Sequence, residues 1–320
     1  MKTQNLLKTT VSALLACSCS VASAKGKIFS FESDAGGFNT KTIFYDNGQE
    51  VVAFDSQFTE DAALKAISHM RTQTQSRLRY LVITHPNPDK FNALSVYQKA
   101  GAEVIASRQT RDSMPAVHAY KKAYFVNAGM FTEETYPRAG TFDRIFDDKV
   151  QLKLAGGDLV ELSELGRTGV SSNQTVAYIP AVNALVVGDL IHHKAHAWLE
   201  GGLSKGQVTP NLSNWIESLK TLKVTFGSTS PTVHGGRGEA VTLPTAIDAQ
   251  IKYLQTADKL VSTYVRELGA RRTELASTNA GEHYKRIREK FEKAFPDYQL
   301  AYMIEYGVYG LALQQSSVLR

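Results

Sequence analysis

The stretch Arg79-Tyr80-Leu81-Val82-Ile83-Thr84-His85-Pro86-Asn87-Pro88-Asp89-Lys90 decides the fold. Its first half is rich in β-branched and aromatic residues, which predicts a buried strand over 79–84. Its second half is a polar loop with two prolines, which end the strand. Because binding and catalytic groups concentrate in loops at strand ends, we expect His85–Lys90 to belong to a functional site.

Two β-rich hairpins of similar sequence, Thr42–Asp55 and Thr175–Asp189, lie before and after this stretch. Each has a turn between two apolar strands and ends on an aspartate. This internal repeat predicts two related half-domains, which would place Asp55 and Asp189 on the same rim of the fold.

The segments between and after the hairpins alternate between helical and extended patterns. We expect helices over 61–77 and 92–101, strands over 103–106 and 229–234, a hairpin over 150–162 and an irregular, aromatic-rich insertion over 108–145. The last strand runs into Gly235-Gly236-Arg237-Gly238, which we interpret as a glycine-rich turn.

From about Leu243 onward the pattern is helical. An apolar stripe at helical spacing stops at Gly269 and consists of Ile247, Ile251, Leu254, Val261, Val265 and Leu268. Further helices are expected over 282–295 and 300–313. Such a stripe favours packing on the chain's own domain over a homo-oligomer contact, which stays open as the alternative.

The strand before His-x-Asn-x-Asp-Lys, the strand ending in Gly188-Asp189 and the last strand before a glycine-rich turn resemble the metallo-β-lactamase fold superfamily over roughly residues 28–245. The resemblance implies an α/β fold, the αββα metallo-β-lactamase-like sandwich, here with a C-terminal helical extension. We place the boundaries at 1–24, 25–245 and 246–320. In the family, a His-x-His-x-Asp-His loop, a later His, an Asp after a strand and a final His in Gly-His-Gly hold two zinc ions.

The resemblance carries few of these zinc ligands over to this chain. In the loop, His85 and Asp89 match, whereas Asn87 and Lys90 stand where the family has histidines. The aspartate that bridges the two ions is Asp189.

The remaining ligand positions are changed as well. The later His falls at Val170, and the last falls at Arg237 if Gly236-Arg237-Gly238 is the Gly-His-Gly turn. An alternative register would make His234 that ligand. Asp55 matches an aspartate that the family keeps behind the metal loop.

These changes argue against zinc, which needs three or four N, S or O donors. One ion would be left with His85, Asn87, Val170 and Asp189, and the other with Asp89, Lys90, Arg237 and Asp189. Two cations beside a dication repel it. We therefore expect no metal cofactor, with Lys90 and Arg237 neutralising the carboxylates. The simpler alternative is that both are ordinary surface residues.

Three functions remain open. In the first, a zinc-free protein binds or acts on an anionic small molecule such as a carboxylate or phosphate ester. The catalytic candidates of this protein are His85, Asp89 and Lys90. Its binding candidates are Asn87, Arg237, Asp55, Asp189, His196 and His234. In the second, a hydrolase of the family opens a lactone, β-lactam, thioester or phosphoester with one zinc or other divalent metal on His85, Asp89 and Asp189. In the third, the C-terminal helices bind a protein partner.

The segment His192-His193-Lys194-Ala195-His196 directly follows Asp189. We interpret it as a solvated or pocket-lining loop rather than a metal site, since histidine is most often simply polar surface. We expect Glu200 to pair with Lys194 or Lys205. The chain has no Gly-x-Ser-x-Gly motif, which argues against a serine hydrolase.

The first 24 residues have the pattern of a secretory signal peptide, with Lys2 and Lys8 as their only charges and Ala22-Ser23-Ala24 at the end. Both cysteines, Cys17 and Cys19, lie in this segment, so the mature chain would have no disulfide. We expect a periplasmic or secreted protein; the alternative is a lipoprotein with a lipid on Cys17. Cleavage would lower the net charge of +5 by the two lysines, and so small a surplus, on an exported chain, argues against a nucleic-acid partner.

Overall fold

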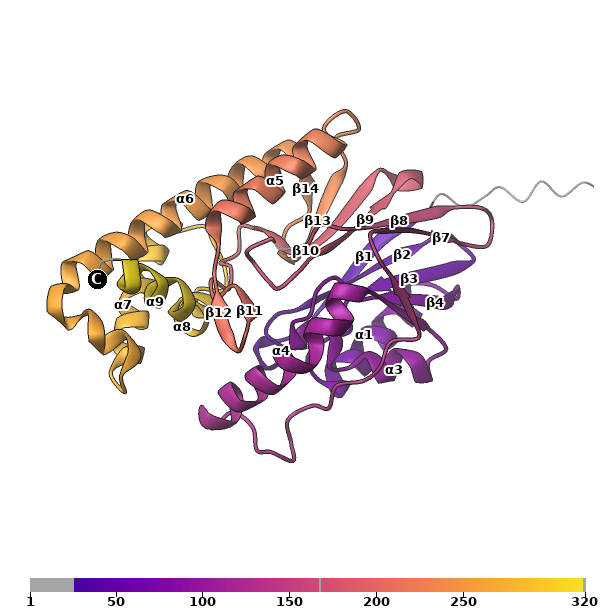
Figure 1. Ribbon diagram of the computed structural model, residues 1–320. Helices are drawn as coiled ribbons and strands as arrows, with labels where there is room; N and C mark the ends of the chain where they lie inside the picture. Colours follow the sequence, from indigo (N-terminus) through magenta and orange to yellow (C-terminus); the bar gives the residue numbers. More distant parts are fainter. Residues whose placement is uncertain (1–25, 167, 319–320) are drawn as a thin grey trace, which may run out of the picture.

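The computed structural model describes residues 26–166 and 168–318. The predicted signal peptide and both cysteines lie outside the described residues. Two six-stranded sheets form the centre of the molecule, and helices cover the outer face of each (Figure 1). Between the sheets lies an apolar core to which both contribute, with Val52 and Phe54 from one and Leu162 and Val186 from the other. The expected αββα sandwich is thereby confirmed.

The first sheet has the strand order β1-β2-β3-β4-β5-β6. Its strands are β1 (Lys27–Glu32), β2 (Lys41–Asp46), β3 (Glu50–Phe54), β4 (Arg77–Val82), β5 (Glu103–Ser107) and β6 (Arg144–Phe146). Its helices are α1 (Glu60–Gln73), α2 (Pro88–Phe91), α3 (Leu94–Lys99) and α4 (Arg108–Asn127). The helix expected over 92–101 is thus shorter, and α1 ends four residues before the expected 77.

The second sheet has the order β14-β13-β10-β9-β8-β7. Its strands are β7 (Lys149–Lys153), β8 (Leu159–Glu164), β9 (Thr175–Ile179), β10 (Ala184–His193), β13 (Thr232–Gly238) and β14 (Val241–Thr242). A small hairpin, β11 (Gly202–Ser204) and β12 (Gln207–Thr209), and the helix α5 (Leu212–Phe226) lie between β10 and β13 in the sequence.

The predicted internal repeat is present in the pairing of the strands. In the first half, β2 and β3 are antiparallel and β3 pairs in parallel with β4. In the second half, β9 and β10 are antiparallel and β10 pairs in parallel with β13. Parallel neighbours end at the same edge of a sheet, so the residues that follow β3, β4, β10 and β13 gather along one rim.

The prediction of an irregular segment over 108–145 was wrong for its first half, because α4 spans Arg108–Asn127. The Ser107 hydroxyl caps the helix by accepting a hydrogen bond from the backbone N–H of Thr110. Met114, Val117, Lys121 and Phe125 recur at helical spacing and are buried. A buried lysine in the stripe and a proline within the helix, Pro115, hid this periodicity.

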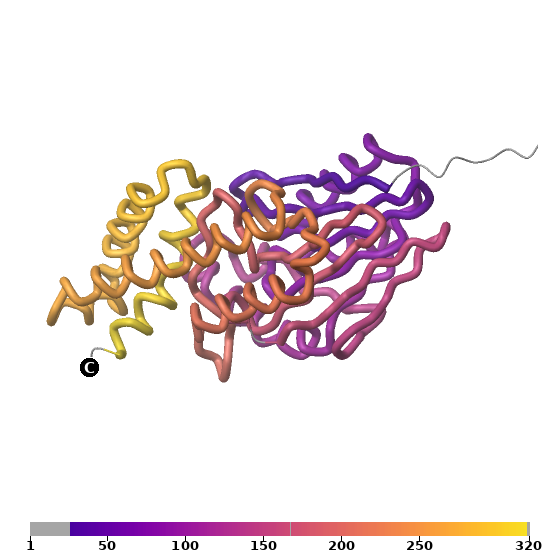
Figure 2. The backbone as a smooth tube through the Cα atoms, turned by 90° about the horizontal axis from the view of Figure 1, so that it is seen from above, coloured from indigo at the N-terminus to yellow at the C-terminus, as the bar shows by residue number. Residues whose placement is uncertain are grey.

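The C-terminal helices are α6 (Leu243–Leu268), α7 (Ala280–Ala294), α8 (Tyr302–Gly307) and α9 (Tyr309–Val318). The predicted stripe of α6 joins the apolar core beneath the second sheet, and the helix ends before Gly269 as expected. The later helices form a lobe at one end of the molecule (Figure 2). The predicted domain boundary at 245–246 falls in the first turn of α6 and stays a prediction. No helix of the described residues is long and apolar enough to cross a membrane.

His196 ties the loop after β10 to this lobe. Its backbone N–H donates to the carbonyl of Gln299 at 2.9 Å, and its ring is fully buried against Tyr253, Phe291 and Tyr298. Burial lowers the pKa of His196 from 6.5 to about 4, so the neutral ring is the form that fits the fold.

We predict that His196 makes the protein sensitive to acid. Protons bind the unfolded chain more tightly than the folded one, so the free energy of unfolding falls as the pH falls from about 6.5 to about 4. Urea denaturation across this range should show the wild type losing roughly 3 kcal/mol more than a His196→Phe variant. A His69→Phe variant controls for the loss of an imidazole on the half-buried face of α1. Parallel pH profiles of wild type and His196→Phe would contradict the prediction.

Candidate functional site

The predicted loop lies at the end of β4, on the rim where the two halves of the sandwich meet. Pro88 opens the short helix α2, a position where the missing N–H of proline costs nothing. Asp89 and Lys90 follow it within the same helix. Asp189 lies within β10, and β13 brings Arg237 alongside it.

Four of the predicted site residues form one buried ion-pair cluster. The Lys90 Nζ lies 3.0 Å from Asp89 Oδ2 and 2.8 Å from Asp189 Oδ1. The Arg237 guanidinium lies 2.9 Å from Asp89 Oδ2 and 3.1 Å from Asp189 Oδ2. Lys90 is completely buried, and the other three are at least nine-tenths buried. Each cation therefore bridges the same two carboxylates, and the alternative that Lys90 and Arg237 are ordinary surface residues is excluded by their burial.

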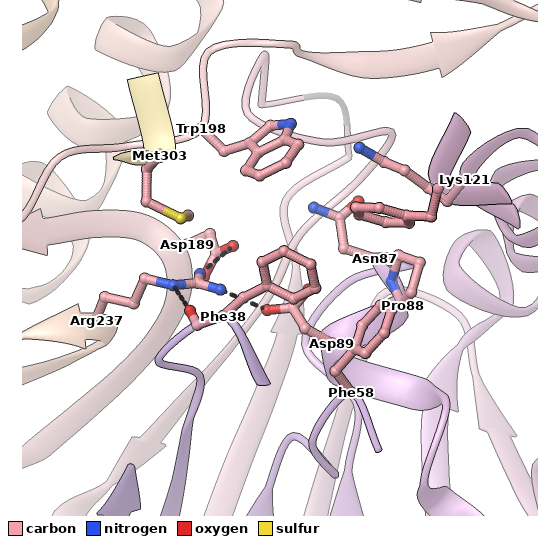
Figure 3. Close-up of a pocket in the computed structure, with 11 residues that line it drawn as sticks. Phe38, Phe58, Asn87, Pro88, Asp89, Lys121, Asp189, Trp198, Arg237 and Met303 are labelled. Atoms are coloured by element: carbon pink, nitrogen blue, oxygen red, sulfur yellow. Dashed lines mark hydrogen bonds and ion pairs between the residues drawn. The ribbon is translucent and has the colours of Figure 1, made fainter. Parts of the chain in front are cut away.

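The remaining donors of Arg237 are also engaged. Its Nε donates to the carbonyl of Phe38 at 2.9 Å, and its Nη2 donates to Thr40 Oγ1 at 3.1 Å. The Thr40 hydroxyl in turn donates to Asp89 Oδ2 at 3.0 Å. Figure 3 shows Arg237, Asp89 and Asp189 directed toward one another beneath the aromatic side chains. The guanidinium is thereby fixed from three sides.

The expected glycine-rich turn is instead part of β13, which runs to Gly238. A Cβ added at Gly236 would lie 2.1 Å from Asp189 Oδ1, and one at Gly235 would lie 2.0 Å from the carbonyl of Ile191. The glycines are therefore needed because β13 passes closely over the cluster and β10. This approach is what brings Arg237 to Asp189.

Mutual attraction keeps the cluster ionised. Burial raises the pKa of both carboxyls, but Lys90 and Arg237 outweigh it; the pKa of Asp89 falls to about 2, and that of Asp189 lies well below its ordinary range. Burial likewise disfavours the charged forms of Lys90 and Arg237, yet the two aspartates raise both pKa values. At neutral pH the cluster holds two positive and two negative charges.

Asp55 and His85 form a second layer beneath this cluster. Asp55 accepts hydrogen bonds from the backbone N–H and the hydroxyl of Thr84, at 2.8 and 2.9 Å. The same hydroxyl lies 2.9 Å from His85 Nδ1, and His85 Nε2 lies 3.6 Å from Asp189 Oδ2. Burial raises the pKa of Asp55 to about 6. Contacts through Thr84 and His85 thus link Asp55 to Asp189, and the two aspartates share a rim as expected. The part played by Thr84 was not predicted.

The histidines after Asp189 are placed differently from the prediction. The strand β10 continues to His193, and His192 is buried with its Nε2 3.5 Å from Asp189 Oδ1. A solvated loop is therefore wrong for His192. His196 lies in the aromatic cluster described above, and His234 lines a separate surface pocket with Lys41. Arg237, and not His234, reaches the aspartates.

A small cavity of about 30 Å³ lies above the ion pairs (Figure 3). Asn87, Pro88, Asp89, Asp189 and Arg237 form its polar side, and the rest is lined by Phe38, Phe58, Lys121, Phe125, Trp198 and Met303. One water molecule needs at least about 10–15 Å³, so the cavity admits a compact group. Met303 comes from α8, which means that the C-terminal extension completes the site.

Lys121 and Glu200 form a second buried ion pair at the cavity wall, which the sequence reasoning missed. Lys121 also lies over the ring of Trp198, 4.7 Å from its centroid, and Trp198 Nε1 donates to Glu200 Oε2 at 2.7 Å. The expected pairing of Glu200 with Lys194 or Lys205 was wrong; Lys194 pairs with Glu239. The partners are 79 positions apart, so only the fold brings them together.

The residues present do not fit a zinc ion. The Lys90 ammonium lies between the two carboxylates that would bridge to metal, and Val170 is packed in the apolar core. Within residues 26–166 and 168–318, no three His, Cys, Asp or Glu side chains are arranged to hold a metal ion. A metal would have to displace the ammonium and the guanidinium from their carboxylates.

The model of the metallo-beta-lactamase superfamily matches residues 35–226, which is more than half of the chain. This chain belongs to the metallo-beta-lactamase superfamily. The match ends before Arg237, so the position that we assigned to the last histidine of the zinc-binding pattern lies beyond it. No curated protein matches the chain.

Solved structures of the superfamily share the fold. A metallo-beta-lactamase from Pontibacter korlensis is 17% identical with a TM-score of 0.53, over 73% of this chain and 96% of its own. A metallo-beta-lactamase from Hirschia baltica is 14% identical with a TM-score of 0.50, over 72% of this chain and 94% of its own. These superfamily domains are covered nearly completely, while more than a quarter of this chain has no counterpart in either.

We predict that Lys90 is required for stability. Lys90→Met keeps the length of the side chain but leaves Asp89 and Asp189 with one cation, which should lower the free energy of unfolding by about 3–5 kcal/mol. The matched control is Lys220→Met, which removes the exposed pair between Lys220 and Glu217, 2.7 Å apart, and should cost less than about 1 kcal/mol. Chemical denaturation measures both. Equal effects of the two substitutions would refute a stabilising role for Lys90.

Proposed function

We propose that this protein is an exported member of the metallo-beta-lactamase superfamily that works without zinc and binds a small molecule in the cavity above its ion pairs. The observation that carries the proposal is the double bridge at the expected metal position, where Lys90 and Arg237 each contact Asp89 and Asp189.

Charge and geometry both support replacement of the metals. Buried carboxylates need compensating positive charge, and two monovalent cations supply as much as Asp89 and Asp189 require. Unlike a metal ion, however, an ammonium or guanidinium has no exchangeable coordination position for water or substrate. The cluster therefore keeps the rim folded but offers no Lewis acid.

The arrangement favours binding over catalysis by the expected residues. Of the predicted catalytic set of His85, Asp89 and Lys90, only Asp89 lines the cavity, and its Oδ2 is engaged by Arg237, Lys90 and Thr40. Asn87, by contrast, lines the cavity and makes no capping hydrogen bond to α2. Asn87 is therefore the best placed polar group for a ligand.

Export rests on the sequence pattern of residues 1–24, with lipid attachment at Cys17 as the alternative. The competing function is a hydrolase with one divalent metal on His85, Asp89 and Asp189. It requires the Lys90 ammonium to leave Asp189 before a metal can approach.

Metal analysis tests the proposal. We expect the mature protein, purified without chelator and equilibrated with zinc or manganese, to hold far less than one ion per chain. The double variant Lys90→His/Arg237→His removes both cations and puts two imidazoles beside Asp89 and Asp189, a donor set that zinc accepts. It should gain about one zinc per chain.

The wild-type protein decides between the two functions. A stoichiometric ion that chelator removes, together with chelator-sensitive hydrolysis of a lactone or β-lactam, would overturn the zinc-free proposal in favour of the hydrolase.

A further inference from the structure

Two adjoining pockets form a groove beside the hairpin of β11 and β12, where β11 contacts α4 and β12 contacts α9 (Figure 1). One pocket, of about 230 Å³, lies where α5 begins, and the other, of about 500 Å³, extends along α9. They share Thr209, Pro210 and Gln314, and neither shares a lining residue with the cavity above the ion pairs. The groove is therefore a separate site, in the range of about 300–1,000 Å³ that small-molecule sites occupy.

The described residues that line the groove are polar or apolar but uncharged. They number eighteen, and in a chain with 21% charged residues about one in five would be expected to carry a charge. The surface pocket that contains Lys41 and Asp297 is the contrast, since five of its nine lining residues are charged. Hydroxyl and amide side chains of the groove belong to Tyr120, Ser171, Ser172, Gln207, Thr209, Asn211, Asn214, Tyr309, Gln314 and Ser317. This lining matches a ligand that is polar without being ionic.

The hydrogen bonds of the groove leave both donors and acceptors for such a ligand. The hydroxyls of Ser171 and Thr209 donate to backbone carbonyls, so their oxygen lone pairs can accept. Gln314 Nε2 donates to the carbonyl of Pro210 at 2.8 Å, which fixes the side chain and leaves its Oε1 as an acceptor. Asn214, exposed in the first turn of α5, adds two N–H donors and an acceptor.

Two tyrosine rings at the α9 end of the groove are held in place from behind. The Tyr120 hydroxyl lies 2.8 Å from that of Tyr309, which in turn donates to the buried Glu200. Tyr309 also stacks on Tyr124, with the ring centroids 5.7 Å apart and the planes 13° from parallel. Rings fixed in this way lose little freedom when a ligand binds, and they offer it flat apolar surface.

A sugar ring meets both requirements, because its hydroxyls donate and accept hydrogen bonds while its C–H faces are apolar. We propose that the groove binds a neutral oligosaccharide, with one sugar ring packed against Tyr120 and Tyr309 and the next among the amides and hydroxyls near Gln314. Gln207, Thr209 and Gln314 are exposed, so a longer saccharide can extend beyond the groove. This inference does not depend on the cavity above the ion pairs or on the absence of zinc.

Three uncharged trisaccharides that differ in linkage and acetylation provide the test: cellotriose, maltotriose and tri-N-acetylchitotriose. Each is titrated against the purified protein, and binding is followed by saturation-transfer NMR, which detects weak complexes. We expect saturable binding of at least one of the three.

Variants of the groove then locate the complex. Tyr120→Ala should weaken binding about fivefold because it removes a ring face, whereas Tyr120→Phe keeps the ring and should bind within about twofold of the wild type. Gln314→Ala should also weaken binding about fivefold, through the loss of a hydrogen-bonding group. The matched control is Gln315→Ala on the same helix, since Gln315 donates to Asp258 and does not line the groove.

Three results would overturn the inference. They are the binding of none of the trisaccharides, binding that Tyr120→Ala and Gln314→Ala leave unchanged, and tighter binding of an uncharged peptide, acetyl-(Gly-Ser)3-amide, than of every trisaccharide. None of these results bears on the metal content of the protein, so this inference and the zinc-free proposal fail separately.

Discussion

Asp89 and Asp189 are buried side by side at the rim of the sandwich, and the rest of the site depends on how their negative charges are compensated. Two carboxylates removed from water repel each other and lose hydration, which costs several kcal/mol unless cations approach closely. Lys90 and Arg237 do so at 2.8–3.1 Å. The glycines at 235 and 236 follow from this requirement, since a side chain there would keep β13 away from Asp189. The need to neutralise Asp89 and Asp189 thus determines which residues β13 can have where it passes Asp189.

The C-terminal extension depends on the same rim. The loop after β10 carries His196 into an aromatic cluster of α6 and α7, while α8 brings Met303 over the ion pairs. Trp198 and Glu200 in that loop contact Lys121 of α4, so helices from both halves of the chain close the cavity. The extension therefore takes part in the site as well as in the core. The apolar walls of the cavity lower the local dielectric constant, which strengthens the ion pairs beneath it.

The sequence predicted most of the sandwich, because hydrophobic periodicity and turn residues depend on local structure. The two similar hairpins also predicted that the fold consists of two related halves. A known ligand pattern also marked Asp55, Asp89, Lys90, Asp189 and Arg237, which the structure places close together at the rim. Lys121 and Glu200 escaped it, since no local pattern connects residues 79 positions apart. The helix α4 escaped it for a related reason, because its buried face includes Lys121, which looks polar until its partner is known. The extent of β13 was misjudged because glycines that permit close approach look like a turn.

A metal ion and a pair of cationic side chains can both neutralise two buried carboxylates, but they differ in the reactions that they allow. A metal exchanges ligands, so substrate and water can enter its coordination sphere. Lys90 is held in ion pairs with Asp89 and Asp189. Arg237 has no donor left for the cavity, because its N–H groups donate to Phe38, Thr40 and the two aspartates. Because the charges at the rim neutralise one another, a ligand must be recognised by the side chains that line the cavity above them. That requirement is why the aromatic walls, Asn87 and the Lys121–Glu200 pair carry more information about the ligand than the residues inherited from the metal-binding pattern.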